Sequence, residues 1–292
     1  MGRLELRLTV SRALGRRDVR DLADRHGIRP TKALGQNFLV DPNLARSIAD
    51  LAGAAPGGRV VEVGAGLGSL TVALAAAGAS VLAIEFDRNL VPALREVVAD
   101  LPDVRIEVAD AMRADWRALL GDGPWTFASN LPYNVAVPLL ITLLEDVPAI
   151  AAYVVMVQRE VADRLVAGPG TEAYGAVSAK VAWLADATFL RAVPPDVFWP
   201  EPKVASALVR LVPRAPRAAM PRAALFRVID EGFAQRRKTM GNALRRLGLD
   251  ADAAATLLVA VGVEPRTRAE DLALDDFVRI TDALLAAGVV AA

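Results

Sequence analysis

The sequence predicts an α/β protein whose first domain is built on a mostly parallel sheet and whose second domain is small and helical. Apolar runs of strand length alternate with helical patterns through the first part of the chain, and this alternation is typical of parallel sheets. One of these runs leads through a glycine-rich turn into a helical pattern. The proline-rich stretch 213–221 is interpreted as a linker to further helical patterns. At 292 residues the chain is long enough to bury a full core and still form a small second domain.

The individual elements follow from local patterns. Strands are expected near 59–63, 80–84, 104–108, 124–129 and 151–157. Two later runs, 188–193 and 204–212, are expected to form an antiparallel pair at one edge of the sheet. Residues 41–51 are predicted to be a helix, because Asp41 suits its N-cap and Pro42 its first position. Further helical patterns cover 69–77, 223–247, 252–261 and 271–287.

The turn after the strand at 59–63 is the first candidate binding element. Its glycines, Gly64, Gly66 and Gly68, have the spacing G-x-G-x-G, whereas dinucleotide-binding loops have G-x-G-x-x-G. No G-K-[S/T] follows the loop, which excludes a nucleoside triphosphate P-loop. No basic residue that would meet a pyrophosphate lies between Gly64 and Ile84. The loop therefore predicts a ligand other than a nucleoside triphosphate.

Acidic residues recur at or near the ends of the predicted strands, namely Glu62, Glu85, Asp87 and Asp110. Glu85 follows Gly64 by twenty-one positions, where Rossmann-type folds place a carboxylate that accepts hydrogen bonds from a ribose. This acidic setting suits a cofactor with a positive charge, a ribose and an adenine. S-Adenosylmethionine therefore fits the sequence better than NAD. For Asp110 the alternative of a helix cap stays open, since Asp caps helices frequently.

The tetrapeptide Asn130-Leu131-Pro132-Tyr133 ends the strand predicted at 124–129. The Asn130 side chain offers a neutral oxygen that accepts a hydrogen bond from an exocyclic amine. Pro132 stiffens the turn, and Tyr133 offers a flat face for a nucleobase. The same residues also suit a plain turn in which the asparagine caps a helix starting near Val135.

The positions of four residues favour the first interpretation. Gly64, Glu85, Asp110 and Asn130 each end one of four predicted strands. Because ligands of open α/β sheets bind outside the carboxyl ends of the strands, these residues are expected to meet in one crevice.

From about Lys32 onward the sequence resembles the bacterial small-subunit ribosomal RNA adenine N6,N6-dimethyltransferases. The resemblance implies a Rossmann-like class I S-adenosylmethionine-dependent methyltransferase domain at 32–213 and a small C-terminal helical RNA-binding domain at 214–292. Residues 1–31 form an extension without interpretation. The matching segments are Gly35–Leu39, Glu62–Gly68, Glu85, Asp110–Ala111, Asn130–Asn134, Phe198–Val204 with Ser206, and Phe233–Lys238 with Asn242.

The resemblance also implies roles for single residues. Asn37, Leu39, Gly64 and Gly66 would line the cofactor, Glu85 would bind its ribose, and Asp110 its adenine amino group. Asn130 would stand between the methyl donor and the target base, with Asn130 Oδ1 and the Leu131 carbonyl accepting the amine hydrogens. Tyr133 would stack on one face of the base. Phe198 or Trp199 would close the other face, unless these aromatic residues belong to the core.

The resemblance implies as substrate a pair of adjacent adenines in a hairpin loop near the 3′ end of 16S rRNA, methylated twice each. Because the helical domain has no stacking-aromatic array and basic regions flank the site, we expect RNA shape to be recognised in an immature small ribosomal subunit. Three alternatives remain. One is an erythromycin-resistance type enzyme acting on 23S rRNA, the second a non-catalytic ribosome assembly factor, and the third an NAD-dependent oxidoreductase. Intact Gly64, Glu85 and Asn130 argue for activity.

Charge is distributed unevenly along a chain whose net charge is zero. Residues 1–32 carry +5 and residues 203–246 carry +9, whereas 33–202 carry −9. An anionic polymer would therefore meet two basic regions beside an acidic body. Arg236, Arg237 and Lys238 are expected to contact rRNA phosphates.

Composition agrees with an intracellular enzyme, and the protein is expected to be cytoplasmic, to bind no metal and to act as a monomer. The chain has no cysteine, and its single histidine, His26, is expected to be exposed and incidental. The first ten residues do not form a signal peptide, and no apolar run is long enough to span a bilayer.

Overall fold

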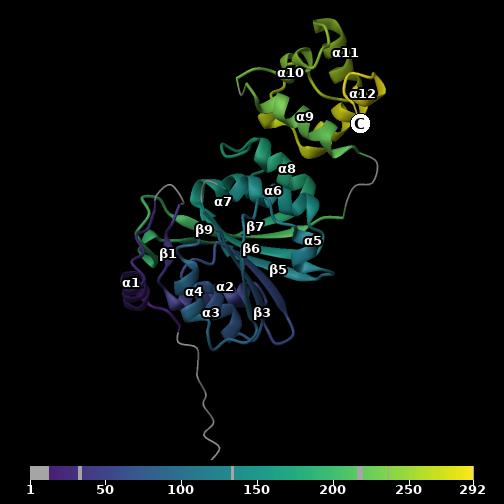
Figure 1. The fold of residues 1–292 in the computed structure, drawn as a ribbon. Helices are drawn as coiled ribbons and strands as arrows, with labels where there is room; N and C mark the ends of the chain where they lie inside the picture. The colour runs from purple at the N-terminus through teal and green to yellow at the C-terminus, as the bar shows by residue number, and fades with distance from the viewer. Residues whose placement is uncertain (1–12, 32–34, 133–134, 216–219, 236, 292) are drawn as a thin grey trace, which may run out of the picture. The chain divides into compact units, whose positions relative to one another are not determined.

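The computed structural model describes residues 13–31, 35–132, 135–215, 220–235 and 237–291, and the chain forms two compact units (Figure 1). The first unit contains the described residues of Met1–Arg159 together with Thr188–Val212. The second contains those of Glu160–Ala187 and Pro213–Ala292. The first unit is an α/β structure and the second is mainly helical, which confirms the predicted fold class.

A seven-stranded sheet forms the centre of the first unit, in the order β4-β3-β2-β5-β6-β9-β7. The first five of these strands run parallel, and β9 pairs antiparallel with β6. β7 and β9 are neighbours at the edge where the later strands were expected. The bounds are β2 Arg59–Val63, β3 Ser80–Glu85, β4 Val104–Val108, β5 Trp125–Asn130, β6 Ile150–Gln158, β7 Ala185–Val193 and β9 Ser206–Pro213.

A second, two-stranded sheet pairs β1 with β8 in antiparallel register, with Leu39 opposite Phe198. β1 is Phe38–Leu39, and β8, Phe198–Trp199, follows the short helix η2 (Pro195–Val197). This pairing joins two segments that are far apart in the sequence, since Phe38 lies opposite Trp199 and Leu39 opposite Phe198, and no local pattern predicts such a contact.

Along the sheet of the first unit, the strands alternate with the helices α2 Pro42–Leu51, α3 Ser69–Ala76, α4 Val91–Val97, α5 Trp116–Leu120 and α6 Ala136–Asp146. α2 begins as predicted, because Asp41 Oδ1 accepts hydrogen bonds from the backbone N–H groups of Asn43 and Leu44 at 2.7 and 2.9 Å. Burial of Ile48 and Leu74 joins α2 and α3 to the sheet residues Val60, Val154 and Leu208 in one apolar cluster. α6 has Val135 at its N-cap without a side-chain capping bond, so Asn130 does not cap this helix.

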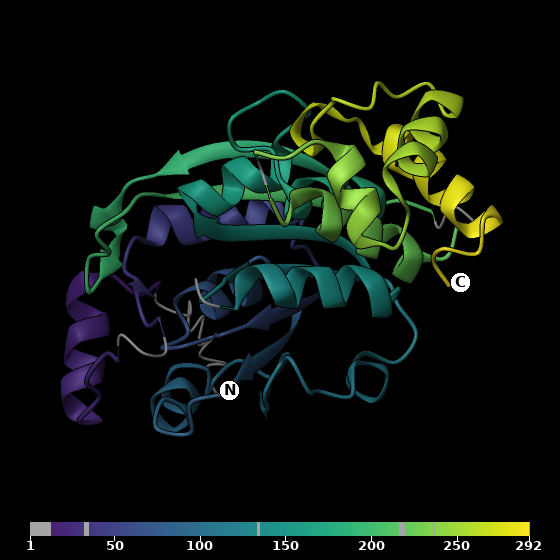
Figure 2. The same ribbon diagram turned by 90° about the horizontal axis from the view of Figure 1, so that it is seen from above.

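The described part of the N-terminal extension, residues 13–31, is part of the fold, and the expectation that His26 is incidental was wrong. Residues Arg16–Arg25 form α1, whose Val19 and Leu22 are buried against Phe38, Leu67 and Leu90. Figures 1 and 2 show α1, at the purple end of the chain, beside the segment that carries β8. A short amphipathic pattern flanked by charged residues does not by itself predict a stable helix, because most helical stability comes from packing against the rest of the protein.

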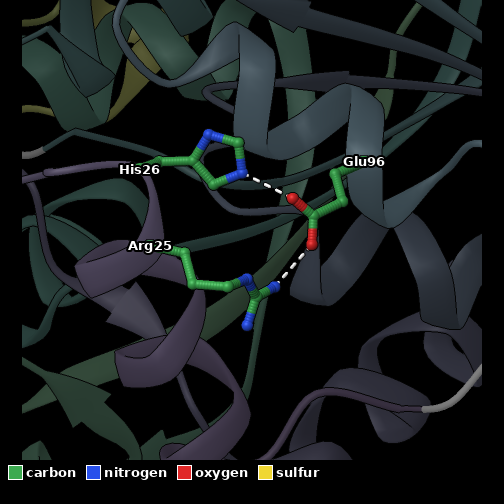
Figure 3. A network of polar contacts seen from close by, with 3 residues as sticks. All are labelled: Arg25, His26 and Glu96. Atoms are coloured by element: carbon green, nitrogen blue, oxygen red, sulfur yellow. Dashed lines mark hydrogen bonds and ion pairs between the residues drawn. The ribbon is translucent and has the colours of Figure 1, made fainter.

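Polar contacts fix the end of α1 to α4 (Figure 3). His26 Nε2 lies 2.6 Å from Glu96 Oε2, and the Arg25 guanidinium pairs with the other carboxylate oxygen. The hydrogen bond from His26, followed by that from Arg25, lowers the pKa of the Glu96 carboxyl. In the middle of α1, Arg20 lies over the ring of Trp199, 5.8 Å from its centroid.

The described helices of the second unit are α7 Arg159–Val166, α8 Ala176–Leu184, α9 Arg222–Phe233, α10 Met240–Arg246, α11 Ala251–Ala260, the short η3 Ala269–Asp271 and α12 Leu274–Ala286. The first residue of α7, Arg159, belongs to the first unit. Its core joins Tyr174 and Trp183 to Leu225, Leu244 and Phe277. Residues 160–187, which the sequence interpretation assigned to the first domain, therefore pack with the second. A linker pattern marks a single boundary in the sequence. It cannot show that the chain contributes 160–187 to the second unit, returns to the first and enters the second again at Pro213.

The single helix predicted over 223–247 is wrong, because the structure has α9 and α10 with a break between them. At the break the Met240 N–H donates to the Thr267 carbonyl at 2.8 Å, and Thr239 forms a bridge with Arg268. This contact turns α10 so that Met240 and Leu244 enter the core with α9. Within the described ranges, no helix is long and apolar enough to cross a membrane.

Candidate functional site

A cavity of about 330 Å³ lies at the carboxyl ends of β2, β3, β4 and β5. β2 stands between β3 and β5, the point where the strand order reverses and where ligands of open parallel sheets bind. Every residue that the sequence assigned to the cofactor lines this cavity, namely Asn37, Leu39, Gly64, Gly66, Glu85, Asp110 and Asn130. Leu131 and Pro132 line it as well.

The glycine loop forms one wall by bringing backbone close to its neighbours. Gly66 has a φ of +59°, and a Cβ there would lie 3.1 Å from the Phe38 ring. Gly64 has a φ of +73° and faces Pro132, which a Cβ would meet at 3.5 Å. A side chain at either position would therefore strain the backbone, and at Gly66 it would crowd the wall.

Glu85 ends β3 with its carboxylate held by backbone donors. The Gly66 N–H donates to Oε2 at 2.7 Å and the Asp87 N–H donates to Oε1 at 2.8 Å. Burial raises the pKa of the Glu85 carboxyl, and these two backbone hydrogen bonds oppose that rise. Each oxygen keeps a further lone pair, so the pre-oriented carboxylate can accept two more hydrogen bonds, the number a ribose diol offers.

Glu62, on the neighbouring strand β2, is almost fully buried and also lines the cavity. Thr71 Oγ1 donates a hydrogen bond to Glu62 Oε2 at 2.6 Å. Burial raises the pKa of the Glu62 carboxyl to about 8, the Thr71 hydrogen bond lowers it, and the charge of Glu85 adds to the rise. Glu62 is therefore mainly protonated at neutral pH.

This raised pKa predicts how stability depends on pH. The folded state keeps the Glu62 proton up to about pH 8, whereas the unfolded chain loses it near pH 4.5. The contribution of Glu62 to the free energy of unfolding is thus complete below pH 4.5 and is lost as pH rises through 8. The pKa shift corresponds to a loss of about a few kcal/mol. In urea unfolding between pH 5 and 9, Glu62→Gln is expected to flatten the decline of the wild type. The partly exposed Glu107→Gln serves as the control, and equal slopes for wild type and Glu62→Gln would refute the assignment.

Asn130 ends β5 and is oriented from a different segment of the chain. Its Nδ2 donates to the Asn37 carbonyl at 3.1 Å, so Oδ1 is the atom left to accept a hydrogen bond from a ligand. Beneath it, the Ser129 hydroxyl donates to the Val63 carbonyl and the Leu131 N–H donates to the Met156 carbonyl at 3.1 Å. The neighbouring strands β2 and β6 thus hold the end of β5 in place.

Asp110 lines the cavity and also stabilises its own turn. Its Oδ1 accepts a hydrogen bond from the Met112 N–H at 3.0 Å, and its Oδ2 lies 3.8 Å from the Arg113 guanidinium. The turn role that the sequence left open is therefore present, and the place at the cavity is present too.

Some cavity residues were missed by the sequence analysis. Phe86 and Met112 line the cavity with 61% and 39% of their surface exposed, which is costly for large apolar side chains unless a ligand covers them. Gln36 links two segments of the cavity wall, because its Nε2 donates a hydrogen bond to Asp87 Oδ2 at 2.8 Å. Their positions next to Glu85, Asp110 and Asn37 were the available signal.

Of the residues predicted to bind the substrate, the structure describes Phe198, Arg237 and Lys238, and none of these three lines the cavity. Phe198 is fully buried in the core beside Leu39, so it supports the wall of the cavity and offers no free face to a base. Arg237 and Lys238 are exposed in the second unit, between α9 and α10. Tyr133 and Arg236 lie outside the described residues.

The cavity is acidic. Glu62, Glu85, Asp87 and Asp110 line it, and no lysine, arginine or histidine stands among the described residues of its wall. The described part of the chain contains no group of three or more His, Cys, Asp or Glu side chains placed to hold a metal ion. A cationic organic ligand with a polar and an apolar part suits this wall best.

Comparison with known proteins agrees with the resemblance found in the sequence. The family model described as ribosomal RNA adenine dimethylase matches residues 28–285. The ribosomal RNA small subunit methyltransferase A of Kineococcus radiotolerans is 48% identical over 274 residues, covering 93% of this chain and 91% of that protein. The protein of the same name from Streptomyces coelicolor is 45% identical over 281 residues, covering 94% and 98%.

Solved structures resemble the fold at low sequence identity. A dimethyladenosine transferase from Plasmodium falciparum superposes with a TM-score of 0.74 and 21% identity, covering 86% of this chain and 98% of that one. The 23S rRNA methyltransferase ErmE gives a TM-score of 0.65 and 24% identity, covering 85% and 99%. These likenesses support the fold.

Proposed function

The chain belongs to the ribosomal RNA adenine dimethylase family, and we propose on this basis that it transfers methyl groups from S-adenosylmethionine to N6 of two adjacent adenines near the 3′ end of 16S rRNA. The observation that carries the proposal is the orientation of Asn130 at the cavity, with Nδ2 bonded to the Asn37 carbonyl and Oδ1 left for an amine. The curated relatives that share most of this chain's length carry the small-subunit name.

The cavity residues fit the proposed cofactor. Glu85, already held by the Gly66 and Asp87 N–H groups, would bind the ribose hydroxyls. Asp110 would bind the adenine amino group, and the exposed apolar faces of Phe86 and Met112 would cover the ring. The bound cofactor supplies a methyl group that its sulfonium already activates. Asn37, Leu39, Gly64 and Gly66 complete the wall.

The protein's own contribution is to make the adenine amine nucleophilic and to hold it in line. The amine lone pair is delocalised into the ring, so acceptors for both hydrogens favour the pyramidal nitrogen of the transition state. Asn130 Oδ1 and the Leu131 carbonyl are the proposed acceptors. Since one hydrogen remains on the nitrogen after the first transfer, the same acceptors serve a second methylation.

The substrate has to present its base outside the stack. Tyr133 is proposed to hold one face of that base. Arg236, Arg237 and Lys238 of the second unit are proposed to contact rRNA phosphates, in a region of net charge +9 over 203–246. The described part of the second unit carries no array of exposed aromatic residues, which supports recognition of RNA shape.

The test is labelled methyl transfer to four substrates. Immature small subunits from a strain that lacks this modification are expected to acquire dimethyladenosine at two neighbouring adenines. Mature unmodified small subunits, protein-free 16S rRNA and large subunits are expected to be poorer substrates. Methylation confined to 23S rRNA would support the resistance-type alternative, and binding of the small subunit without any transfer would support an assembly factor.

A further inference from the structure

Glu62 is a buried carboxyl group in the cavity wall that the proposed chemistry leaves without a role. Its only hydrogen bond described in the structure comes from Thr71 Oγ1, at 2.6 Å. Burial of a carboxyl group is costly, and an apolar side chain would fill the same space more cheaply. A carboxyl group at this place therefore calls for a function beyond packing.

The charges around Glu62 are all of one sign. α3, which carries Thr71, has no charged residue, and neither does β5 on the other side of β2. β3 contributes Glu85, and Asp87 and Asp110 line the same cavity. No basic side chain is among the described residues that line the cavity, and Arg113, outside this lining, lies 3.8 Å from Asp110. A proton on Glu62 therefore limits the negative charge of the ligand-free cavity.

The two ligands of the proposed reaction differ by one charge. S-Adenosylmethionine carries a sulfonium in addition to its ammonium and carboxylate groups, whereas the product S-adenosylhomocysteine has a neutral thioether. Glu62 lines the cavity of about 330 Å³ that would hold this charge. A positive charge within about 4–6 Å of a carboxyl group lowers its pKa by about 1–3 units.

We propose that Glu62 is protonated in the ligand-free protein, releases its proton to solvent when the cationic methyl donor binds, and takes up a proton when the neutral product replaces the donor. The O–H bond of the carboxyl group breaks on donor binding, and the sulfonium balances the carboxylate that remains. This inference rests on the proposed function for the identity of the cofactor. Glu62 is thereby a specificity residue that favours donor over product.

A pH dependence follows from this coupling. Because donor binding releases a proton, donor affinity rises with pH until Glu62 is ionised in the free protein as well. Product binding releases none from Glu62, and protonation of Glu85, the proposed ribose ligand of both molecules, affects their two Kd values alike. The ratio of product Kd to donor Kd is expected to rise by up to about tenfold per pH unit between pH 6.5 and 7.5.

The experiment is calorimetry of each ligand at pH 7 in phosphate and in Tris, whose different ionisation enthalpies reveal the number of protons released. The donor is expected to release close to one proton and the product close to none. Sinefungin, which carries an amine in place of the sulfonium methyl, is expected to behave like the donor. Donor and product share the amino acid part, so their difference isolates the charge at sulfur.

Two variants identify the titrating group. Glu62→Gln is expected to bind the donor without proton release and with a pH-independent ratio, and the control Glu107→Gln to behave like the wild type. Thr71→Val keeps the carboxyl group and is expected to keep the release, which serves as the test if Glu62→Gln does not fold. Equal proton counts for donor and product in the wild type, or release that persists in Glu62→Gln, would overturn the inference. Failure of the wild type to bind either ligand would refute the cofactor assignment itself.

Discussion

Asn130→Ala is expected to lower the kcat of methyl transfer by about 10²–10³-fold while the Kd of S-adenosylmethionine stays within a few-fold of the wild type. The magnitude is that of removing one pre-oriented polar group from a transition state. The Asn130 amide acts on the target amine, whereas the cofactor contacts belong to Glu85, Asp110 and the glycine loop. Single-turnover methylation of small subunits measures the first quantity, and calorimetry measures the second.

The geometry at Asn130 also distinguishes its two atoms. Asn130→Asp keeps an acceptor oxygen but has no N–H for the Asn37 carbonyl, which accepts from Nδ2 at 3.1 Å. Repulsion between the two oxygens should displace the side chain, so this variant is expected to recover only part of the lost activity. Asn43→Ala, an exposed substitution of the same kind at the start of α2, is the control. Near-normal turnover in Asn130→Ala would exclude the acceptor role.

Glu85→Ala is expected to have the opposite effect, with weaker cofactor binding and an intact chemical step at saturating cofactor. Loss of charge-assisted hydrogen bonds to the ribose corresponds to about 1.5–3 kcal/mol, or roughly a 10- to 150-fold rise in Kd. The substitution also leaves the Gly66 and Asp87 N–H groups without the acceptor they share.

Glu85→Gln tests whether the charge matters or only the shape. One end of the amide is an NH₂ group, which would face either the Gly66 N–H or the Asp87 N–H, both of them donors. The Glu85→Gln variant is therefore expected to bind the cofactor nearly as weakly as the Glu85→Ala variant. Burial raises the pKa of Glu85, so wild-type binding should also weaken as pH falls through that raised value. Unchanged cofactor affinity in both variants would show that the ribose contact lies elsewhere, and Glu107→Gln is again the matched control.

The parallel strands were predictable because each is encoded by a few consecutive residues. The runs that form β2, β3, β4, β5 and β6 are rich in β-branched or aromatic residues, and the structure places them within two residues of the predicted bounds. The helix after Asp41 was equally predictable, since its cap and first residue are local signals. Strand-end residues converge in any parallel sheet, and this is why Gly64, Glu85, Asp110 and Asn130 could be assigned to one cavity.

Contacts between distant segments account for the predictions that failed. The break between α9 and α10 depends on the Thr267 carbonyl, and the order of α1 depends on Phe38, Leu67 and Leu90. Phe198 looked like a stacking residue from its motif, but pairing with Leu39 places it in the core. None of these partners lies within a helical turn or a hairpin of the residue concerned, so no periodicity in the sequence reports them.

By itself the sequence determined the α/β class, the resemblance to the rRNA adenine dimethyltransferases and the identity of the residues at the ends of the strands, because short-range patterns encode all three. Only the tertiary structure decided which atom of Asn130 faces a ligand, that α1 forms part of the wall's support, and that burial raises the pKa of the Glu62 carboxyl. The physical reason is that orientation and protonation depend on burial and on hydrogen-bond partners. Those partners, such as Asn37 for Asn130, are brought together by folding from positions far apart in the chain.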